Sequence, residues 1–257
     1  MLSFRNVSKA YRGALAVAGV SLEIARGRFL AVIGESGSGK STLLKMINRL
    51  IEPTFGAIEL DGEDLASRDV VALRRSIGYV FQGVGLFPHM TAGENVAITP
   101  RLLGWPEVRV AERVESLLDR VGLSAETYAE RYPHELSGGQ RQRVGFARAL
   151  ASETCLLLLD EPFGALDPVI RADLQDDLRQ LHDSLGLTTV MVTHDMSEAL
   201  LLADEIAVMR AGKIVQTGAP RELVRAPADD YVAHLISAPR RHAAVLTALD
   251  RPADDAT

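Results

Sequence analysis

Short, continuous runs of apolar residues recur along the chain and are separated by segments with helical spacing. Continuous rather than alternating apolar runs are typical of strands that are buried on both faces, as in a parallel sheet covered by helices. The runs are FLAVIG (29–34), IGYVFQ (77–82), CLLLLD (155–160), TTVMVTHD (188–195) and EIAVMR (205–210). The pattern predicts an α/β fold built on a buried, largely parallel sheet.

Two other stretches of the chain show different patterns. Near the N-terminus, three segments alternate and turn at glycines, which predicts a smaller antiparallel sheet. These segments are LSFRNVSKAYRG (2–13), AVAGVSLEIARG (16–27) and GAIELDGEDL (56–65). From about Leu86 to Ser152 the strand pattern disappears and helical spacing dominates, as in VRVAERVESLLDRVGL. We therefore predict a domain over residues 1–238, with a helical subdomain inserted at about 86–152 and a short, frayed tail over 239–257.

Composition and charge disfavour several classes of function for this chain. The 257 residues are 47% hydrophobic, which is enough to bury a full core. The net charge of −6 and the scattered basic residues disfavour binding to nucleic acid. A single cysteine, Cys155, excludes an intrachain disulfide and fits a reducing compartment, and its place in CLLLLD predicts a small buried side chain. The N-terminus lacks the signal-peptide pattern, and no apolar run reaches the ~18 residues of a membrane span.

A glycine-rich segment follows the first apolar run. Gly34-Glu35-Ser36-Gly37-Ser38-Gly39-Lys40-Ser41 matches G-x-x-x-x-G-K-[ST] between a predicted strand and a predicted helix. In that context the amides of Gly37, Gly39 and Lys40 can surround phosphate groups. The Lys40 ammonium can neutralise β and γ oxygens, and the Ser41 hydroxyl can ligate Mg²⁺. The alternative is a glycine-rich strand-to-helix turn without a ligand.

Two adjacent carboxylates end the run LLLLDE. The carboxyl ends of parallel strands are where such sheets bind ligands, and successive strand side chains point to opposite sides. Asp160 can therefore face a Mg²⁺ ion while Glu161 faces an attacking water as a general base. The competing interpretation is an acidic turn before Pro162.

A second glycine-rich helix start occurs at LSGGQ, residues 136–140, before the helical pattern RQRVGFARALAS. Its amides offer a second group of anion-facing donors. One nucleotide hardly needs two such groups from one chain, so the second is expected to act on a nucleotide bound by another copy, in a head-to-tail dimer. Taken alone, Ser137 is also explained as a simple N-cap.

The order of the motifs closely resembles the ATP-binding-cassette (ABC) ATPases over roughly residues 1–235. The motifs are GESGSGKST, Gln82 after a strand, LSGGQ, LLLLDE, GALD and His194 after another strand. The resemblance implies a P-loop NTPase core of the RecA type, carrying the antiparallel sheet and the helical subdomain. It implies ATP and Mg²⁺ as cofactors, a homodimer in the ATP-bound state and an ATPase at the cytoplasmic face of the inner or plasma membrane.

The resemblance also implies individual roles. Gln82 couples Mg²⁺ and water to a membrane partner, His194 senses the γ-phosphate, and Tyr11 stacks on adenine. The alternatives are a surface-loop glutamine, a structural strand-end histidine and a plain sheet aromatic. The expected catalytic residues are Lys40, Gln82, Glu161 and His194, and the expected metal ligands are Ser41, Gln82 and Asp160. The residues expected to bind the nucleotide are Tyr11, Gly34, Glu35, Ser36, Gly37, Ser38, Gly39, Lys40, Ser41 and Thr42. The residues expected to act in trans are Ser137, Gly138, Gly139 and Gln140, and Asp167 is expected to couple the two sites of the dimer.

The segment after Gln82, GVGLFPHMTAGENVAITPRLLGW, resembles the ATPases of osmoprotectant importers, which take up glycine betaine, choline, carnitine and related quaternary amines. IEPTFGAIELDGEDL adds to this resemblance, whereas Gly83 and Val84 depart modestly from the commonest form. The partners implied are integral-membrane permease subunits and, indirectly, an extracytoplasmic solute-binding protein. The main alternative is an importer of amino acids or another small solute. A DNA-repair or translation ATPase would need a coiled coil or a second cassette, and Glu161 argues against a switch without turnover.

Overall fold

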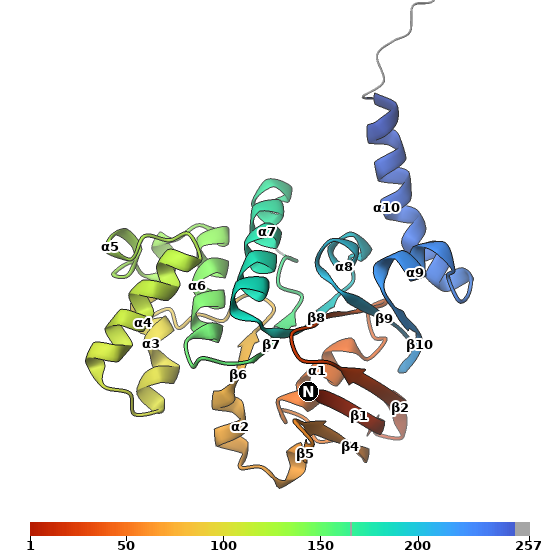
Figure 1. Cartoon of the computed structure of the whole chain (residues 1–257), viewed down its shortest axis with the longest axis horizontal. Helices are drawn as coiled ribbons and strands as arrows, with labels where there is room; N and C mark the ends of the chain where they lie inside the picture. The colour runs from red at the N-terminus through yellow and green to blue at the C-terminus, as the bar shows by residue number, and fades with distance from the viewer. Residues whose placement is uncertain (165, 250–257) are drawn as a thin grey trace, which may run out of the picture.

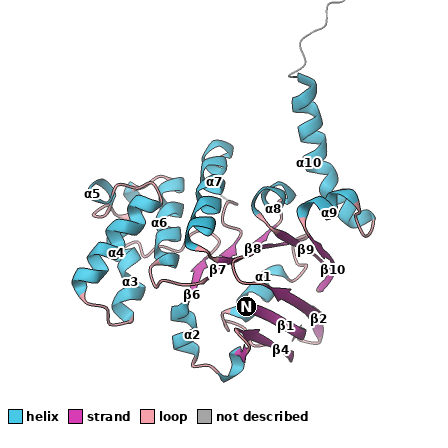
Figure 2. Ribbon diagram, viewed as in Figure 1, coloured by secondary structure: helices cyan, strands magenta, loops and turns pink. Residues whose placement is uncertain are grey.

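Two β-sheets and a group of helices make up the fold (Figures 1 and 2). The computed structural model describes residues 1–164 and 166–249. Its larger sheet has the strand order β10-β9-β3-β8-β7-β6, and neighbouring strands are parallel except for β10 and β9. The strands are β3 Phe29–Ile33, β6 Ile77–Val80, β7 Leu156–Asp160, β8 Thr188–Thr193, β9 Glu205–Arg210 and β10 Lys213–Gly218. All five apolar runs therefore contribute strands to the predicted sheet.

The smaller sheet is antiparallel and comes from the N-terminal part of the chain. Its order is β2-β1-β4-β5, with β1 paired to both β2 and β4. The strands are β1 Leu2–Tyr11, β2 Ala14–Ile24, β4 Phe55–Leu60 and β5 Glu63–Asp64. The prediction from the alternating segments is confirmed.

Helices fill the chain between β6 and β7 and cover the larger sheet. The first group is α3 Ala92–Leu102, α4 Glu107–Arg120, α5 Ala125–Tyr128 and α6 Gly138–Leu150, and Figure 1 shows it standing to one side of the sheet. The others are α1 Lys40–Ile47, α2 Val70–Ser76, α7 Pro168–Leu185, α8 Met196–Leu202, α9 Pro220–Arg225 and α10 Asp230–Leu249, with short 3₁₀ helices at Leu65–Ser67 and Pro133–Glu135. Among the described helices, none has both the length and the apolar character that crossing a bilayer requires.

The larger sheet has a separate hydrophobic core on each face. On β7, Leu156 and Leu158 pack with α1 and the smaller sheet, whereas Leu157 and Leu159 pack with α6 and α7. This alternation is the period-2 geometry of a strand buried on both faces. It explains why the sequence of β7 is apolar at every position up to Asp160.

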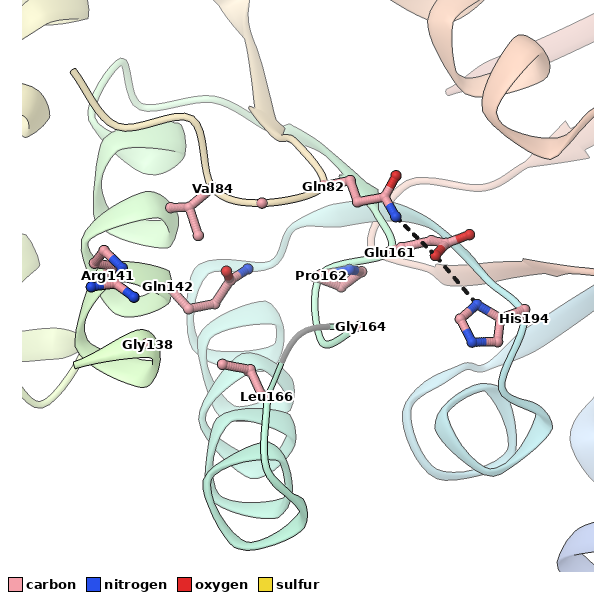
Figure 3. Close-up of a pocket in the computed structure, with 11 residues that line it drawn as sticks. Gln82, Val84, Gly138, Arg141, Gln142, Glu161, Pro162, Gly164, Leu166 and His194 are labelled. Carbon is pink, nitrogen blue, oxygen red and sulfur yellow. Dashed lines mark hydrogen bonds and ion pairs between the residues drawn. The ribbon is translucent and has the colours of Figure 1, made fainter. Parts of the chain in front are cut away.

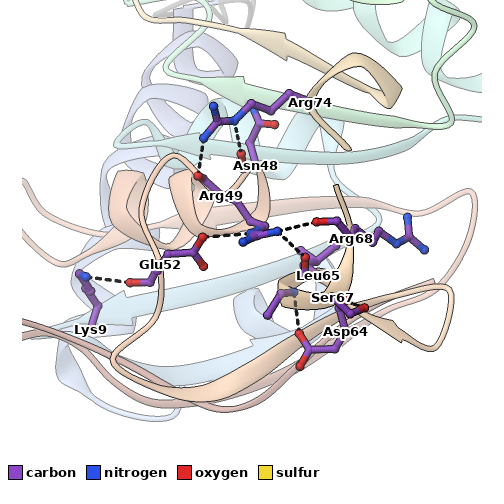
Figure 4. A network of polar contacts seen from close by, with 10 residues as sticks. Lys9, Asn48, Arg49, Glu52, Asp64, Leu65, Ser67, Arg68 and Arg74 are labelled. Carbon is purple, nitrogen blue, oxygen red and sulfur yellow. Dashed lines mark hydrogen bonds and ion pairs between the residues drawn. The ribbon is translucent and has the colours of Figure 1, made fainter. Parts of the chain in front are cut away.

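A network of arginines fixes the C-terminal end of α1 (Figure 4). Arg49 donates to the carbonyls of Leu65 and Arg68 at 3.0 and 2.8 Å. Arg74 on α2 donates to the carbonyls of Asn48 and Arg49 at 3.2 and 2.6 Å. Cations suit the carbonyl end of a helix. These contacts tie the end of α1 to the 3₁₀ helix Leu65–Ser67, which follows β5, and to α2, so the helix that begins at Lys40 is anchored at its far end.

Two expectations from the sequence are wrong. Cys155 is exposed, because it lies in the turn before β7 begins at Leu156 and not in the buried strand. The segment from Pro239 is not frayed as far as Leu249, because it continues α10, with Pro239 inside the helix. Its run AAVLTAL is rich in alanine and leucine, which favour helix. Residues 250–257 of the expected tail lie outside the described residues.

Candidate active site

The predicted site residues gather where the parallel strands end. The phosphate-loop segment follows β3, Gln82 follows β6, Glu161 follows β7 and His194 follows β8. Parallel strands present their carboxyl ends at one edge of the sheet, so these four segments meet there. The topology thus brings together residues that are far apart in the sequence.

The glycine-rich segment forms a tight loop into α1. Gly39 is the N-cap of α1 with φ of 105°, a left-handed conformation that favours glycine. A Cβ at this position would also overlap the carbonyl oxygen of Ala16 on β2. Within the loop, Glu35, Ser36 and Gly37 are exposed, and Gly34 and Ser38 are buried. Thr42, in the first turn of α1, is half-buried.

The Lys40 ammonium lies inside the curve of this loop. Its Nζ donates to the carbonyls of Gly34 at 2.7 Å and Glu35 at 2.9 Å, and the residue is 5% exposed. Burial lowers the pKa of Lys40 from its usual value, while the nearby carboxylates of Glu161 and Asp160 act in the opposite sense. The loop therefore holds a cation close to two acidic side chains.

Asp160 joins the end of β7 to α1. Its Oδ1 accepts a hydrogen bond of 3.0 Å from the Ser41 hydroxyl, and its Oδ2 accepts one of 3.3 Å from the Tyr79 hydroxyl. Burial, followed by the charge of Asp160, raises the pKa of Tyr79 far above its usual value, so its hydroxyl remains a donor.

The oxygens of this cluster fit Mg²⁺. Ser41 and Asp160 offer the hard oxygen ligands that this ion prefers. Ser38 Oγ is buried nearby in the loop and has no hydrogen-bond partner among the described residues. Across residues 1–164 and 166–249, no group of three or more His, Cys, Asp or Glu side chains is placed to hold a metal. Protein sites for Mg²⁺ usually supply one or two carboxylates, with water and phosphate oxygens completing the coordination.

The Glu161 carboxylate contacts residues from both neighbouring strands. Its Oε2 accepts a hydrogen bond of 3.4 Å from Gln82 Nε2 and lies 3.3 Å from His194 Nδ1. Glu161 has φ of 47° and lies beyond the end of β7, so its backbone is not the extended one that the sequence argument assumed. Asp160 and Glu161 nevertheless contact different partners. A left-handed backbone at a non-glycine residue is strained and is often found at functional sites.

A hollow of about 540 Å³ connects this carboxylate with the start of α6 (Figure 3). Gln82, Glu161 and His194 lie at one end, and Gly138 and Arg141 lie at the other. The Gln142 side chain points into it, and its buried Nε2 has no hydrogen-bond partner among the described residues.

The segment Ser137–Gln140 starts α6 and forms a capping box. The Ser137 hydroxyl accepts from the Gln140 amide at 3.2 Å, and Gln140 Oε1 accepts from the Ser137 amide at 2.9 Å. The N-cap interpretation of Ser137 is therefore correct as a description of local structure. Among the described residues, no hydrogen bond or ion pair joins this segment to the phosphate loop of the same chain.

Gly139 at the start of α6 and Asp167 at the start of α7 both lie against Ile170. A Cβ on Gly139 would lie 2.5 Å from Cγ2 of Ile170, which explains the glycine as a close approach of the two helices. Asp167 is exposed and caps α7 by accepting from the Ile170 amide at 3.0 Å. The predicted in-trans segment and the predicted dimer-coupling residue are thus structural neighbours.

Tyr11 lies apart from the hydrogen-bonded cluster, at the end of β1. It is 44% exposed and is paired with Ala14 across the β1–β2 turn. The same hairpin supplies Ala16, whose carbonyl touches the phosphate loop at Gly39. Tyr11 is therefore on the element next to the loop, and Lys9 Nζ lies over its ring, 5.3 Å from the centroid.

Sequence reasoning missed Tyr79 and Gln142. Tyr79 stands out in the sequence only as a tyrosine with a polar hydroxyl inside the apolar run IGYVFQ. Gln142 lies in RQRVGF and reads as an ordinary helix residue.

Comparisons with known proteins agree on one family. Residues 17–164 match the family model described as ABC transporter. The choline transport ATP-binding protein OpuBA of Bacillus subtilis is 54% identical over 93% of this chain and 63% of its own length. The glycine betaine uptake system ATP-binding protein YehX of Escherichia coli is 48% identical over 90% of this chain and 75% of its own length. This chain therefore spans less than two thirds of the length of OpuBA.

Solved structures with the same fold include two ATP-binding cassettes. A dimeric cassette in a post-hydrolysis state with ADP and Pi is 34% identical, with a TM-score of 0.77 over 86% of this chain and 99% of that one. The cbiO1 protein of Clostridium perfringens, part of the complex cbiONQ, is 31% identical, with a TM-score of 0.81 over 88% and 91% of the two chains. The predicted P-loop NTPase fold is confirmed. Because the family model matches more than half of its residues, the chain belongs to the ABC transporter family.

Proposed function

We propose that this chain binds and hydrolyses ATP as the nucleotide-binding subunit of an importer. The main support is the Glu161 carboxylate, which contacts both Gln82 and His194 at the sheet edge that also carries the phosphate loop. Hydrolysis requires a general base placed in this way, whereas a loop with a purely structural or binding role does not require one.

The phosphate loop binds the nucleotide. The amides of Gly37, Gly39 and Lys40 face the phosphates at the positive end of α1, and the Lys40 ammonium neutralises charge on the β and γ oxygens. Bound Mg²⁺ would add charge neutralisation at the same oxygens. Ser41, Asp160 and Gln82 would hold that ion, and Tyr11 would stack on the adenine.

Glu161 takes the proton from the attacking water. The Gln82 amide and the His194 ring orient its carboxylate through Oε2, because both contact this oxygen. Gln82 also lies at the start of the segment that leads into the helical subdomain, so its position depends on that subdomain.

The complete site is shared between two copies of the chain. Ser137, Gly138, Gly139 and Gln140 of one copy act on the γ-phosphate of the nucleotide bound at Lys40 of the other, and Asp167 links the two sites. The dimeric cassette with ADP and Pi supports this arrangement, as does the absence of contacts between these residues and the phosphate loop within the described part of one chain.

A membrane subunit docks on the groove between α2, α3 and the end of β6. The groove encloses about 330 Å³, and its lining includes Leu50, Phe81 and Phe87. These side chains are 43%, 43% and 45% exposed, and the grouping of three large, exposed apolar residues in one groove is typical of an interaction surface. Phe81 precedes Gln82, so a subunit in the groove adjoins the residue that contacts Glu161. The chain is then peripheral to the membrane, at its cytoplasmic face.

The transported solute is a quaternary amine such as glycine betaine, choline or carnitine. This assignment rests on the named transport roles of OpuBA and YehX. The alternative, a different small solute, is supported by the sulfate/thiosulfate import protein CysA of Pseudomonas syringae, which is 46% identical over 91% of this chain. Amino acids belong to the same alternative.

ATPase assays of the reconstituted importer test both the ATPase assignment and the solute assignment. The chain is assembled with its membrane subunits and binding protein in proteoliposomes, and hydrolysis is measured with each solute in turn. We expect Mg²⁺-dependent hydrolysis that glycine betaine, choline or carnitine stimulates. Stimulation by sulfate or an amino acid alone would overturn the solute assignment, and no hydrolysis under any condition would overturn the ATPase assignment.

A further inference from the structure

The pairing of β6 with β7 places Tyr79 and Asp160 on one face of the larger sheet. The two strands are parallel, and Tyr79 is opposite Leu158. Asp160 lies two residues beyond Leu158, so its side chain points to the same side. Tyr79 and Leu158 belong to the core that packs against α1, which is the helix that carries Ser41.

Two hydroxyl groups hold the two oxygens of the Asp160 carboxylate. Ser41 donates to Oδ1 at 3.0 Å and Tyr79 donates to Oδ2 at 3.3 Å. An aspartate rotates freely about its last side-chain bond when one oxygen alone is held, because that torsion has broad minima. A second donor on the other oxygen fixes the plane of the carboxylate.

The Tyr79 ring is itself fixed. The residue is 8% exposed, and its ring centroid lies 4.3 Å from that of Phe81 at an interplanar angle of 39°. Asp160 is 6% exposed. The hydroxyl is therefore delivered by a packed ring on a buried strand, which is a more rigid support than a surface loop.

We propose that Tyr79 is a positioning residue that orients the Asp160 carboxylate for Mg²⁺. The inference rests on the proposed function, in which Asp160 holds the Mg²⁺ of bound ATP. Tyr79 touches neither nucleotide nor metal. It acts by keeping one carboxylate oxygen engaged so that the other faces the Ser41 hydroxyl and the ion in a single orientation. Residues that orient metal ligands in this way affect metal affinity about 10–100-fold.

The test is Tyr79→Phe in the full chain, which keeps the ring and removes the hydroxyl. Equilibrium dialysis with labelled ATP gives the affinity in EDTA and the affinity in Mg²⁺, and Mn²⁺ binding to the ATP complex is followed by electron paramagnetic resonance. We expect the affinity in EDTA to stay within about twofold of wild type. We expect the affinity of the ATP complex for Mn²⁺, and the Mg²⁺-dependent gain in ATP affinity, to fall about tenfold.

Tyr132→Phe is the matched control, since Tyr132 is exposed and lies in the helical subdomain away from Asp160. It should match wild type in every measurement. Equal losses in EDTA and in Mg²⁺ for Tyr79→Phe would show a merely structural role and overturn the inference, as would unchanged Mn²⁺ affinity. Wild-type protein that binds no ATP in either condition would instead overturn the proposed function itself.

Discussion

His194 Nδ1 lies 3.3 Å from Oε2 of Glu161, the same oxygen that accepts from Gln82. Two residues that follow β6 and β8 thus converge on one carboxylate oxygen of the residue that follows β7, the strand between them. A change in any of the three strand-end loops is therefore expected to alter the position or the contacts of this oxygen.

Glu161→Gln should bind ATP normally and lose turnover. The amide keeps the shape of the side chain and its contacts but cannot accept a proton, so hydrolysis should fall about 10²- to 10⁴-fold. With Mg-ATP the variant should elute from size exclusion as a stable dimer, since the nucleotide that joins the copies is not consumed. Glu107→Gln, on exposed α4, is the control. A monomer in every nucleotide condition would count against the shared site.

Lys40→Ala should weaken ATP binding about 10- to 100-fold, as expected for the loss of charge-assisted hydrogen bonds, and should abolish measurable hydrolysis. The Lys40 ammonium lies within the loop, 2.7 and 2.9 Å from the carbonyls of Gly34 and Glu35. The loop sequence GESGSGKS contains no other cationic residue that could replace it. Binding is measured by equilibrium dialysis. Lys45→Ala, on the same helix but at its other end, should behave as wild type. Undiminished turnover in Lys40→Ala would refute the site.

Mixing two inactive variants should restore activity. In a dimer of a Lys40→Ala chain with a Ser137→Arg chain, one composite site carries both changes and the other carries neither. Random pairing of the chains, with independent sites, should recover about a quarter of wild-type hydrolysis.

The arginine at position 137 removes an N-cap, which costs about 1 kcal/mol, so folding of that variant must be checked by thermal unfolding. Ser124→Arg, at the N-cap position of α5, controls for the added arginine and should stay active alone, although the Ser124 side chain makes no capping hydrogen bond. If the mixture stays inactive while both variants are folded, two independently working shared sites are excluded.

Stability should fall as the pH drops because of His182, which is buried in α7. Its Nδ1 lies 2.9 Å from Thr189 Oγ1, and its ring lies 5.2 Å from that of Phe29. Burial, with the Arg179 charge adding to it, lowers the pKa of His182 below its usual 6.5, although Asp204, Asp183 and the Gly27 backbone act in the opposite sense. The folded state therefore binds this proton less readily than the unfolded chain. The contribution of His182 to stability is therefore fully present above about pH 6.5, its unfolded-state value, and is lost as the pH falls from there through the lower pKa of the folded state.

Urea unfolding of wild type and His182→Asn at pH 7.5 and pH 5.5 measures this effect. Asparagine keeps a polar atom near the position of Nδ1 but does not titrate. The wild type should lose more unfolding free energy between the two pH values than the variant does, and the difference isolates His182 from other titrating groups. His89→Asn, at an exposed position, should follow wild type. Identical pH dependence in wild type and His182→Asn would contradict the prediction.

The sequence predicts the sheet well because continuous apolar runs such as LLLLD have few other structures available. It predicts the edge strand β10 poorly, since KIVQTG is half-exposed and mixes polar with β-branched residues. The exposure of Cys155 depends on where β7 begins, and strand boundaries shift by a residue or two without a change in the apolar pattern.

In the candidate site, too, some features can be predicted from local sequence and others depend on tertiary packing. Motif spacing predicts Lys40, Ser41, Asp160 and Glu161 as site residues because each motif carries its own chemistry, and the structure places their side chains close together. The contact of Tyr79 with Asp160 depends on the register of β6 against β7, which nothing in either strand encodes locally. The closeness of Gly139 to Ile170 likewise depends on how α6 packs on α7, although the glycine itself is visible in LSGGQ.

At Glu161, the left-handed backbone favours glycine, whereas the proposed hydrolysis requires a carboxylate. Glycine adopts this conformation without steric cost, whereas a glutamate there is held under strain by the folded chain around it. Glu161→Gly should therefore relieve the strain and leave the loop easier to form, while removing the base. On the proposed function, the residue that suits this backbone best and the residue that hydrolysis requires are different, so Glu161→Gly is expected to raise the free energy of unfolding and to abolish hydrolysis together.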